Sequence, residues 1–404
     1  MIVIFPATGS SSPRFSRVLA NVGLLAGSVL VFLIVCEVAA RLLLPAPQTV
    51  KVQEKQETYE APGGFERLDT KAEKSIDSVV LFGGPHGVRL RPNTRGEIHN
   101  HVLSGRDIVI EVNSLGVRYP ELGPKSPGEF RVLVLGDSIT FGDFVLESET
   151  WTRQMEALTE GRRKPIRFIN AGLPGAGTAE ELALFREIGE RVKPDLVLVG
   201  MYLNDAQSGS LFFTKTPPGL WAKSRFLTWL FDRFQLLDMR FFRKALPGEI
   251  DPLWRETFRA GRNLHPGDMF GTRDGFDFEI YNAYMDFGLG WNPKAWKIIE
   301  TITAALRNEV NAREARLAVV LFPVHIQVMG TVQRFEPQES CRRMSARLHI
   351  PFDDPLPTLR RTWQSNHEKL FYDHCHYTPR GYAVLARQTV DFLDSEKLIP
   401  PPGR

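Results

Sequence analysis

A serine directly follows a run of apolar residues that is typical of a buried strand. Val132–Leu135 is an unbroken apolar run, and it stops abruptly at Gly136, Asp137 and Ser138. In open α/β sheets, ligands bind in the crevice beyond the carboxyl ends of the strands. A hydroxyl at that edge lies where a nucleophile would be useful, so Ser138 is the candidate nucleophile.

The sequence also offers a base that could activate this hydroxyl. A serine is a weak nucleophile until a neighbouring group takes its proton, and His376 could be that group. Asp373, on the same loop, could accept the other imidazole N–H and fix the tautomer. A serine activated in this way could carry out acyl transfer, which also needs hydrogen-bond donors for the oxyanion that develops during the reaction. The backbone N–H groups of Ser138 and Gly175 and the side-chain amide of Asn204 are predicted to supply them.

Each of these residues could have a plainer role when it is taken alone. Ser138 could cap the following helix, Gly175 could be a turn residue, and Asn204 could cap a helix or turn. Asp373 and His376 could form a structural hydrogen bond. Their segments converge on one edge of the predicted sheet, however, and this convergence favours acyl-transfer chemistry.

The histidine loop contains ligand types that also occur in metal sites. His374, Cys375 and His376 are consecutive, and adjacent ligands rarely complete a zinc tetrahedron alone. The three cysteines of the chain, which include Cys36 and Cys341, are too few for a disulfide scaffold. The sequence does not decide whether Cys341 and Cys375 form a disulfide. We predict no metal and no other cofactor.

Alternating strands and helices must position the candidate residues. Such alternation is typical of a parallel sheet covered by helices. Strands are predicted at Arg131–Leu135, Ile166–Ile169, Leu196–Met201, Leu317–Phe322 and Ile350–Phe352, and helices at Thr150–Leu158, from Thr178 onward, at Trp296–Val310 and at Pro379–Leu393. Thr178 with Glu181 matches a capping box, and Thr378 is the expected cap of the last helix.

An apolar segment near the N-terminus is predicted to cross a membrane. Val18–Cys36 carries no charge, and extension to Leu44 gives the length of about 20 residues that a spanning helix needs. A cleavable signal peptide is the main rival, because Val38–Ala40 offers small residues to a peptidase. A buried core helix is the third possibility. Arg14 and Arg17 precede the span, which favours a cytoplasmic N-terminus and an exported domain.

The remaining chain has the composition of a globular protein. Of its 404 residues 43% are apolar and 24% are charged, and a net charge of +3 gives no reason to expect nucleic acid as a partner. The predicted organisation is a leader at 1–17, a transmembrane anchor at 18–44, a tether at 45–77, a small β-rich subdomain at 78–125 and the main domain at 126–398, with a helical insertion at about 207–290.

The insertion is dense in large aromatic residues. They are Trp221, Phe226, Trp229, Phe231, Phe234, Phe241 and Phe242. They could simply pack the insertion onto the core, or they could line an acyl-binding or membrane-facing lid.

Four blocks resemble the SGNH (GDSL) hydrolase family. They are Gly136–Ser138, Asn170–Gly175, Asn204–Asp205 and Asp373-x-x-His376, in this order. The resemblance implies an α/β fold of the flavodoxin-like three-layer type with a five-stranded parallel sheet. It also implies that Ser138 is the nucleophile, that His376 and Asp373 form the triad with it, and that Gly175 and Asn204 complete the oxyanion hole.

The resemblance and the predicted span together imply a membrane-anchored serine esterase. It would hydrolyse carboxylic esters, in particular O-acyl or O-acetyl groups, through an acyl-enzyme. The alternatives are an O-acyltransferase on cell-envelope glycans with the same residues and a non-catalytic envelope binding protein of the same fold. The expected partners are an ester substrate, such as an acylated envelope polysaccharide or lipid, and the membrane itself. The catalytic domain is expected outside the cytoplasm.

Overall fold

The structure, a computed structural model, describes most of the chain outside the insertion. The described residues are 13–44, 49–54, 81–82, 88–101, 103–207, 224–227, 229–230, 268–283 and 286–402. The chain divides into two units, and we describe each by itself. The first comprises Met1–Pro47 and Thr216–Gly248, and the second comprises Gln48–Lys215 and Glu249–Arg404.

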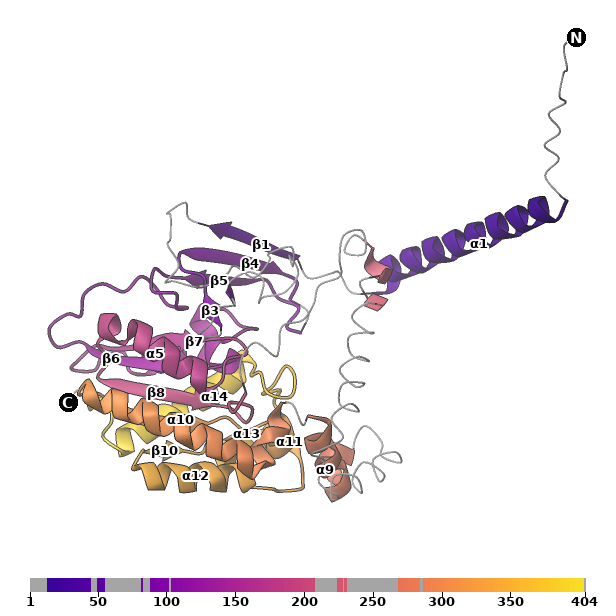
Figure 1. Cartoon of the computed structure of the whole chain (residues 1–404). Coiled ribbons are helices and arrows are strands. Elements are labelled where there is room, and N and C mark those ends of the chain that lie inside the picture. Colours follow the sequence, from indigo (N-terminus) through magenta and orange to yellow (C-terminus); the bar gives the residue numbers. More distant parts are fainter. Residues whose placement is uncertain are drawn as a thin grey trace, which may run out of the picture. The chain divides into compact units, whose positions relative to one another are not determined.

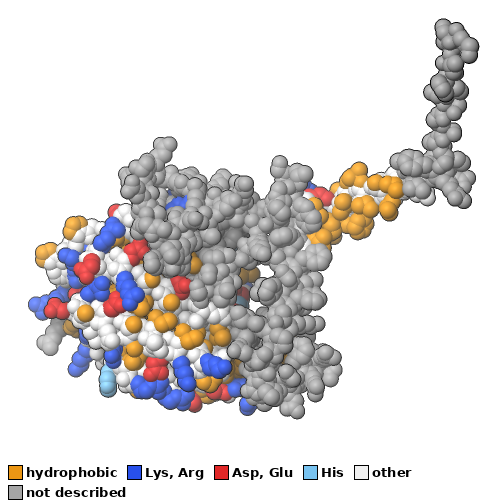
Figure 2. All heavy atoms as spheres, in the orientation of Figure 1, with side chains coloured by type: hydrophobic (Ala, Val, Ile, Leu, Met, Phe, Trp, Pro, Cys, Tyr) orange, Lys and Arg blue, Asp and Glu red, His pale blue; other side chains and the backbone are white. Residues whose placement is uncertain are grey.

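The first unit contains the long apolar helix α1, Pro13–Leu43. Its stretch Asn21–Leu43 has a mean hydropathy of 2.5 and is long and apolar enough to cross a membrane. Most side chains of this stretch are exposed, for example 74% at Leu24 and 81% at Leu43. Figure 2 shows hydrophobic side chains covering the described part of this helix. Such a helix is either a membrane span or a signal sequence.

A short segment of the insertion is bound to the C-terminal end of α1. Glu37 accepts hydrogen bonds from the Ser224 hydroxyl at 2.7 Å and from the Phe226 N–H at 3.0 Å. The Arg225 guanidinium donates to the carbonyl of Arg41 at 3.2 Å. The last carbonyls of a helix have no donor partner within it, so this contact satisfies one of them.

The second unit is built around the predicted five-stranded sheet. Its strands are β6 (Phe130–Gly136), β7 (Ile166–Gly172), β8 (Leu196–Met201), β9 (Arg316–Leu321) and β10 (Phe352–Asp353). They pair in the order β10-β9-β8-β6-β7, and every pair is parallel. All six residues of β8 are buried, as expected for a central strand covered on both faces. The predicted parallel sheet is therefore confirmed.

Helices cover both faces of this sheet and form the three layers in Figure 1. The helices are α4 (Trp151–Leu158), α5 (Thr178–Val192), α10 (Pro293–Ala312), α11 (His325–Met329), α12 (Glu336–Leu348), α13 (Leu356–Asn366) and α14 (Pro379–Ser395). Helix α10 packs against α5 and α12, whereas α4 packs against α14. Thr378 caps α14 as predicted, because its side chain accepts from the Gly381 N–H. Strands β7 and β8 lie on opposite sides of β6 in the sheet. Because connections between parallel strands are right-handed as a rule, adding strands on both sides of the first one puts helices on both faces.

Helix α5 is capped differently from the prediction. The helix begins at Thr178 as expected, but the residue before it, Gly177, is the N-cap. Glu180, not Glu181, accepts the Gly177 N–H at 3.1 Å. The Thr178 hydroxyl instead donates to the carbonyl of Asp205, which ties the start of α5 to the loop after β8.

Two small antiparallel sheets precede the main sheet. Strands β1 (Thr49–Glu54), β4 (Thr94–His99) and β5 (Ile108–Val112) form one, and β2 (Leu81–Phe82) pairs with β3 (Arg89–Leu90) in the other. Strand β1 falls in the segment that we predicted to be a tether. The strand pairs antiparallel along β4, from Thr49 opposite His99 to Glu54 opposite Thr94.

Only parts of the predicted insertion belong to the described residues. Its end contains α8 (Asp268–Gly271), α9 (Arg273–Asn282) and the 3-10 helix η5 (Phe287–Trp291). Trp296 of α10 donates to the carbonyl of Gly290 at 2.7 Å and so holds η5 to the main helical layer. Most of the aromatic residues of the insertion, including Trp221 and Phe231, lie outside the described residues.

Candidate active site

The structure brings the predicted nucleophile, base and acid into one hydrogen-bonded chain. Ser138 Oγ lies 2.8 Å from His376 Nε2, although 238 residues separate them in sequence. His376 Nδ1 lies 2.7 Å from Asp373 Oδ2. The second oxygen of Asp373 accepts the backbone N–H groups of Cys375 and His376. This arrangement fixes the imidazole with Nε2 facing the hydroxyl, which is the geometry for proton removal.

A closed loop holds His376 in place. Tyr372 N–H donates to the carbonyl of His376 at 2.8 Å, and Phe371 and Tyr377 form an antiparallel bridge. The Tyr377 hydroxyl donates to the carbonyl of Pro323 after β9, which fastens the loop to the sheet. His376 therefore lies on a braced loop at the carboxyl end of the strands.

Glycines let the helix that starts at Ser138 pack directly on the strand ends. Helix α3 (Ser138–Phe141) begins at the predicted nucleophile, and Asp137 caps it by accepting the Ile139 N–H at 2.8 Å. Gly136 has a φ of +151°, and a Cβ there would lie 2.2 Å from Thr140 Oγ1. A Cβ on Gly172 would lie 2.2 Å from the Phe141 nitrogen. Larger residues at these positions would push α3, with Ser138, away from the sheet.

Side chains from three distant elements hold the end of α3. Arg118 donates to the carbonyls of Phe141, Gly142 and Val145 at 3.0, 2.6 and 2.8 Å. Asn170 also donates to the Phe141 carbonyl, and the Tyr382 hydroxyl donates to that of Ile139. Burial lowers the pKa of Arg118 to about 10, so its guanidinium stays protonated at neutral pH. No pattern in the sequence indicated this support.

Removing the Arg118 guanidinium should destabilise helix α3, which starts at Ser138. We expect Arg118→Met to remove the three hydrogen bonds that the guanidinium donates and to lower the free energy of unfolding by roughly 2–4 kcal/mol, with a lower kcat. Arg347→Met is the matched control, because Arg347 is exposed and pairs with Glu300 at the surface. Arg347→Met should lower the free energy of unfolding by less than about 1 kcal/mol. Denaturant unfolding of the full chain in detergent measures both, and equal losses would contradict the role of Arg118.

The predicted oxyanion donors follow the strands on either side of β6. Gly136 lies level with Gly172 of β7 and with Gly200 of β8 in the sheet register. The turn with Gly175 follows β7, and Asn204 follows β8, so both come from the same end of the sheet as Ser138.

Each of these predicted donors has an N–H for which no acceptor is found among the described residues. Ser138 is the first residue of α3, so its N–H has no acceptor within the helix. Gly175 has a φ of +71°. Within the part of the chain that the structure describes, its N–H donates to no other backbone carbonyl. One hydrogen of the Asn204 amide is taken by Asp286 Oδ1 at 3.0 Å, which leaves the second for another acceptor.

The charges around His376 favour its protonated form at neutral pH. Burial alone would lower the pKa of His376, but the hydrogen bond and the charge of Asp373 outweigh burial and raise it to about 9. Burial would raise the pKa of Asp373, but the hydrogen bond and charge of His376 bring it below the usual range. Burial also raises the pKa of Asp137, and more strongly those of Glu181 and Asp205.

One cluster in the described part of the chain has the spacing of metal ligands. The side-chain donor atoms of Asp373, His374 and Cys375 lie within 4.8 Å of one another. Their own partners argue against a metal. Asp373 Oδ2 lies 2.7 Å from His376 Nδ1, and His374 Nε2 lies 2.6 Å from Asp286 Oδ2. Burial raises the pKa of the Cys375 thiol well above its usual value, whereas a metal binds the thiolate. Cys341 and Cys375 are both free thiols. We assign no metal to this cluster.

The structure also places the Phe144 ring against His376, and the same ring contacts His101. The ring of Phe144 lies 4.4 Å from that of His376 and 4.5 Å from that of His101, between centroids. Burial lowers the pKa of His101 to about 4, so its ring is neutral. His101 follows β4 in the small antiparallel sheet, so that sheet contributes to the site. No spacing or motif in the sequence indicated this contact.

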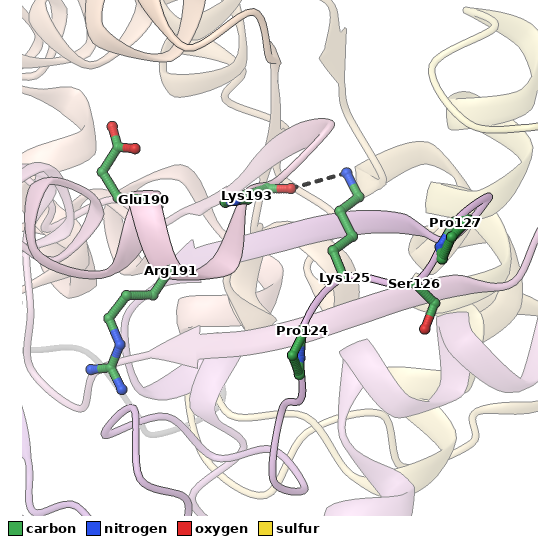
Figure 3. A pocket seen from close by; sticks show the side chains of 7 residues that line it. All are labelled: Pro124, Lys125, Ser126, Pro127, Glu190, Arg191 and Lys193. Carbon is green, nitrogen blue, oxygen red and sulfur yellow. Dashed lines mark hydrogen bonds between the residues drawn. The ribbon is translucent and has the colours of Figure 1, made fainter.

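An open hollow of about 500 Å³ lies at the other end of the sheet. It is lined by the segment before β6, Pro124–Pro127, and by Glu190, Arg191 and Lys193 at the end of α5. Figure 3 shows Lys125 reaching the carbonyl oxygen of Lys193, at 3.1 Å. Its amine also contacts Asp195, before β8. This hollow lies by the amino ends of the strands and is not part of the site that contains Ser138.

Comparison with solved structures returns 62 matching chains. A psychrotrophic esterase, EstA from Pseudoalteromonas sp., has 12% identity, with 67% of this chain and 100% of that chain covered and a TM-score of 0.37. A lipase/acylhydrolase from Enterococcus faecalis has 13% identity, with 68% and 99% covered and a TM-score of 0.36. A catalytic variant of Axe2, an acetylxylan esterase from Geobacillus stearothermophilus, has 14% identity, with 65% and 94% covered and a TM-score of 0.36.

These structural likenesses are too distant to indicate a substrate. No curated protein matches the sequence. The model of the GDSL-like Lipase/Acylhydrolase family matches residues 134–384, which is more than half of the chain and includes Ser138, Asn204 and His376. The chain therefore belongs to the GDSL-like lipase/acylhydrolase family and is an ester-hydrolysing enzyme.

Proposed function

We propose that this protein is a membrane-anchored serine esterase that works through Ser138, His376 and Asp373. The observation that carries the proposal is the continuous chain from the Ser138 hydroxyl through both ring nitrogens of His376 to Asp373, at 2.8 and 2.7 Å. A hydroxyl so paired can be deprotonated as it attacks, and the half-buried carboxylate stabilises the imidazolium that forms.

The reaction runs in two halves. Ser138 Oγ bonds to the ester carbonyl carbon while His376 Nε2 takes the hydroxyl proton, and the oxyanion is held by the N–H groups of Ser138 and Gly175 and by Asn204. The ester C–O bond then breaks as His376 returns that proton to the leaving alcohol. Water next attacks the acyl carbon with His376 as base, and the free acid leaves Ser138 regenerated.

The membrane part of the proposal rests on α1. Its 23-residue apolar stretch matches the thickness of a bilayer, and Arg14 and Arg17 precede it. Phe226 and Trp229, beside the end of α1, stack with ring centroids 6.2 Å apart. Aromatic residues of this kind gather at membrane interfaces, which supports a membrane-facing role for this part of the insertion. We propose that α1 is an uncleaved anchor and that the catalytic unit is exported.

The proposed substrates are small O-acyl esters, in particular O-acetyl groups on a cell-envelope glycan. An exported and tethered enzyme meets such esters. The half-buried ring of Phe144 forms a wall beside His376, and Tyr372 lies 6.2 Å from that ring. Aromatic groups so close to the base support a short acyl group over a long chain.

An ester panel tests this proposal. We expect the full chain in detergent to hydrolyse p-nitrophenyl acetate fastest, with kcat/KM falling as the acyl chain lengthens. A preference for long chains would contradict the short-acyl assignment and would favour a lipid substrate. Product analysis with an acetylated glycan then separates hydrolysis, which yields free acid, from transfer to a second sugar hydroxyl by the same residues.

A further inference from the structure

An acidic residue from the end of the insertion lies between the predicted oxyanion hole and the catalytic loop. Asp286 immediately precedes η5 and is 82 residues from Asn204 in sequence. Its Oδ1 accepts from Asn204 Nδ2 at 3.0 Å, and its Oδ2 lies 2.6 Å from His374 Nε2. One carboxylate thus contacts both sides of the site.

The contact with Asp286 fixes how the Asn204 amide is oriented. An amide can present either its oxygen or its nitrogen, and only the nitrogen is a donor. A carboxylate next to it accepts from the nitrogen and repels the oxygen. With one N–H held by Asp286, the second N–H has a defined direction. An oxyanion hole accelerates a reaction only when its donors are already oriented before charge develops.

His374 balances the charge that this arrangement would otherwise place near the oxyanion. A bare carboxylate beside the hole would repel the developing negative charge. The short contact of Asp286 with His374 pairs that carboxylate with an imidazole whose pKa burial would lower but the charge of Asp286 raises.

The backbone and ring of His374 are braced as well. Its carbonyl accepts the His325 N–H at 2.8 Å, and its ring faces that of Phe287 at 5.5 Å. His374 therefore connects Asp286 to the loop that carries Asp373 and His376.

We propose that Asp286 is a positioning residue of the oxyanion hole, which holds the Asn204 amide toward the substrate and is itself held by His374. This inference rests on the proposed function, since it assigns Asp286 a task in the same reaction. It also gives the end of the insertion a part in catalysis, because Asp286 comes from that segment of the chain.

The expected effect of removing this carboxylate is on kcat. We expect Asp286→Ala to lower kcat toward p-nitrophenyl acetate by about 10- to 100-fold and to leave KM within about threefold, because the amide stays but loses its direction. Asp286→Asn should lie closer to wild type, since its side-chain oxygen can still accept from Asn204 and its NH₂ can donate to His374. Asp274→Ala, an exposed acid on α9, is the matched control and should match wild type.

A double-mutant cycle shows whether Asp286 acts through Asn204. In an Asn204→Ala background, Asp286→Ala should lower kcat by less than about threefold further. A full second loss in that background, or wild-type kcat in Asp286→Ala, would overturn the proposal. If Asp286→Ala unfolds at a lower temperature than Asp274→Ala, its loss of kcat could come from a weakened fold. Asp286→Leu then replaces it in the cycle, because leucine fills the position but offers no hydrogen-bond acceptor, and the same results support or overturn the proposal. Ser138→Ala separates the two hypotheses: if it retains activity, the proposed function fails, whatever the Asp286 variants do.

Discussion

Replacing Ser138 with alanine should abolish ester hydrolysis, with a loss in kcat on the order of 10⁴- to 10⁶-fold. The reason is that the hydroxyl forms the covalent bond to the acyl group, and His376 alone offers no comparable nucleophile at that point of the site. The fold should persist, because among the residues that the structure describes the hydroxyl has a hydrogen bond to His376 alone. Activity on p-nitrophenyl acetate is the measurement.

Ser365→Ala is the matched control for this change. Ser365 is exposed on α13, and its hydroxyl donates to the Thr362 carbonyl, within the same helix. Its activity should equal that of the wild type. Residual activity of Ser138→Ala within about tenfold of the wild type, in folded protein, would show that another group is the nucleophile.

Asp373→Asn should lower kcat by about 10⁴-fold although it is isosteric. The carboxylate accepts from His376 Nδ1 and so leaves Nε2 free to take the Ser138 proton. An amide can present its NH₂ to Nδ1 instead, and the ring would then adopt the wrong tautomer. Asp391→Asn, at an exposed position of α14, is the control and should leave kcat unchanged.

The same carboxylate sets the pH dependence that we expect. His376 must be neutral to act as a base, and the hydrogen bond and charge of Asp373 outweigh burial to raise its pKa to about 9. For the wild type, kcat/KM should therefore rise with pH between about 6.5 and 9 as His376 loses its proton. In Asp373→Asn the residual activity should reach its plateau at lower pH, because the charge that favours the imidazolium is gone. A wild-type profile that falls over this range would contradict the assignment of His376 as the base.

Much of the fold was predictable because its strands are buried on both faces. Short, continuous apolar runs such as Val132–Leu135 and Leu196–Met201 are typical of such strands, and the structure confirms both. The cap at Thr378 was predictable for a similar reason, since its signal is local. The cap of α5 was predicted wrongly, because Glu180 and Glu181 are adjacent acids and only the start of the helix decides which one reaches back.

The supporting residues of the site could not be predicted from local patterns. Arg118 contacts carbonyls that are 23 to 27 residues away in sequence, and Asp286 contacts an amide 82 residues away. Nothing in the spacing of a lone arginine or aspartate distinguishes it from a surface charge. Such contacts arise only when the fold brings distant elements together. The pairing of Ser138 with His376 could be expected from the sequence, in contrast, because four motif blocks occur in a fixed order.

Covalent labelling of the wild-type chain tests the central claim most directly. A fluorophosphonate reacts with a serine only when a neighbouring base activates it, so peptide mass spectrometry should find one adduct, on the peptide with Ser138, and none in Ser138→Ala or His376→Ala. Folded wild-type protein that remains unlabelled, or that is labelled at a different serine, would contradict the proposal that Ser138 and His376 form a nucleophilic pair.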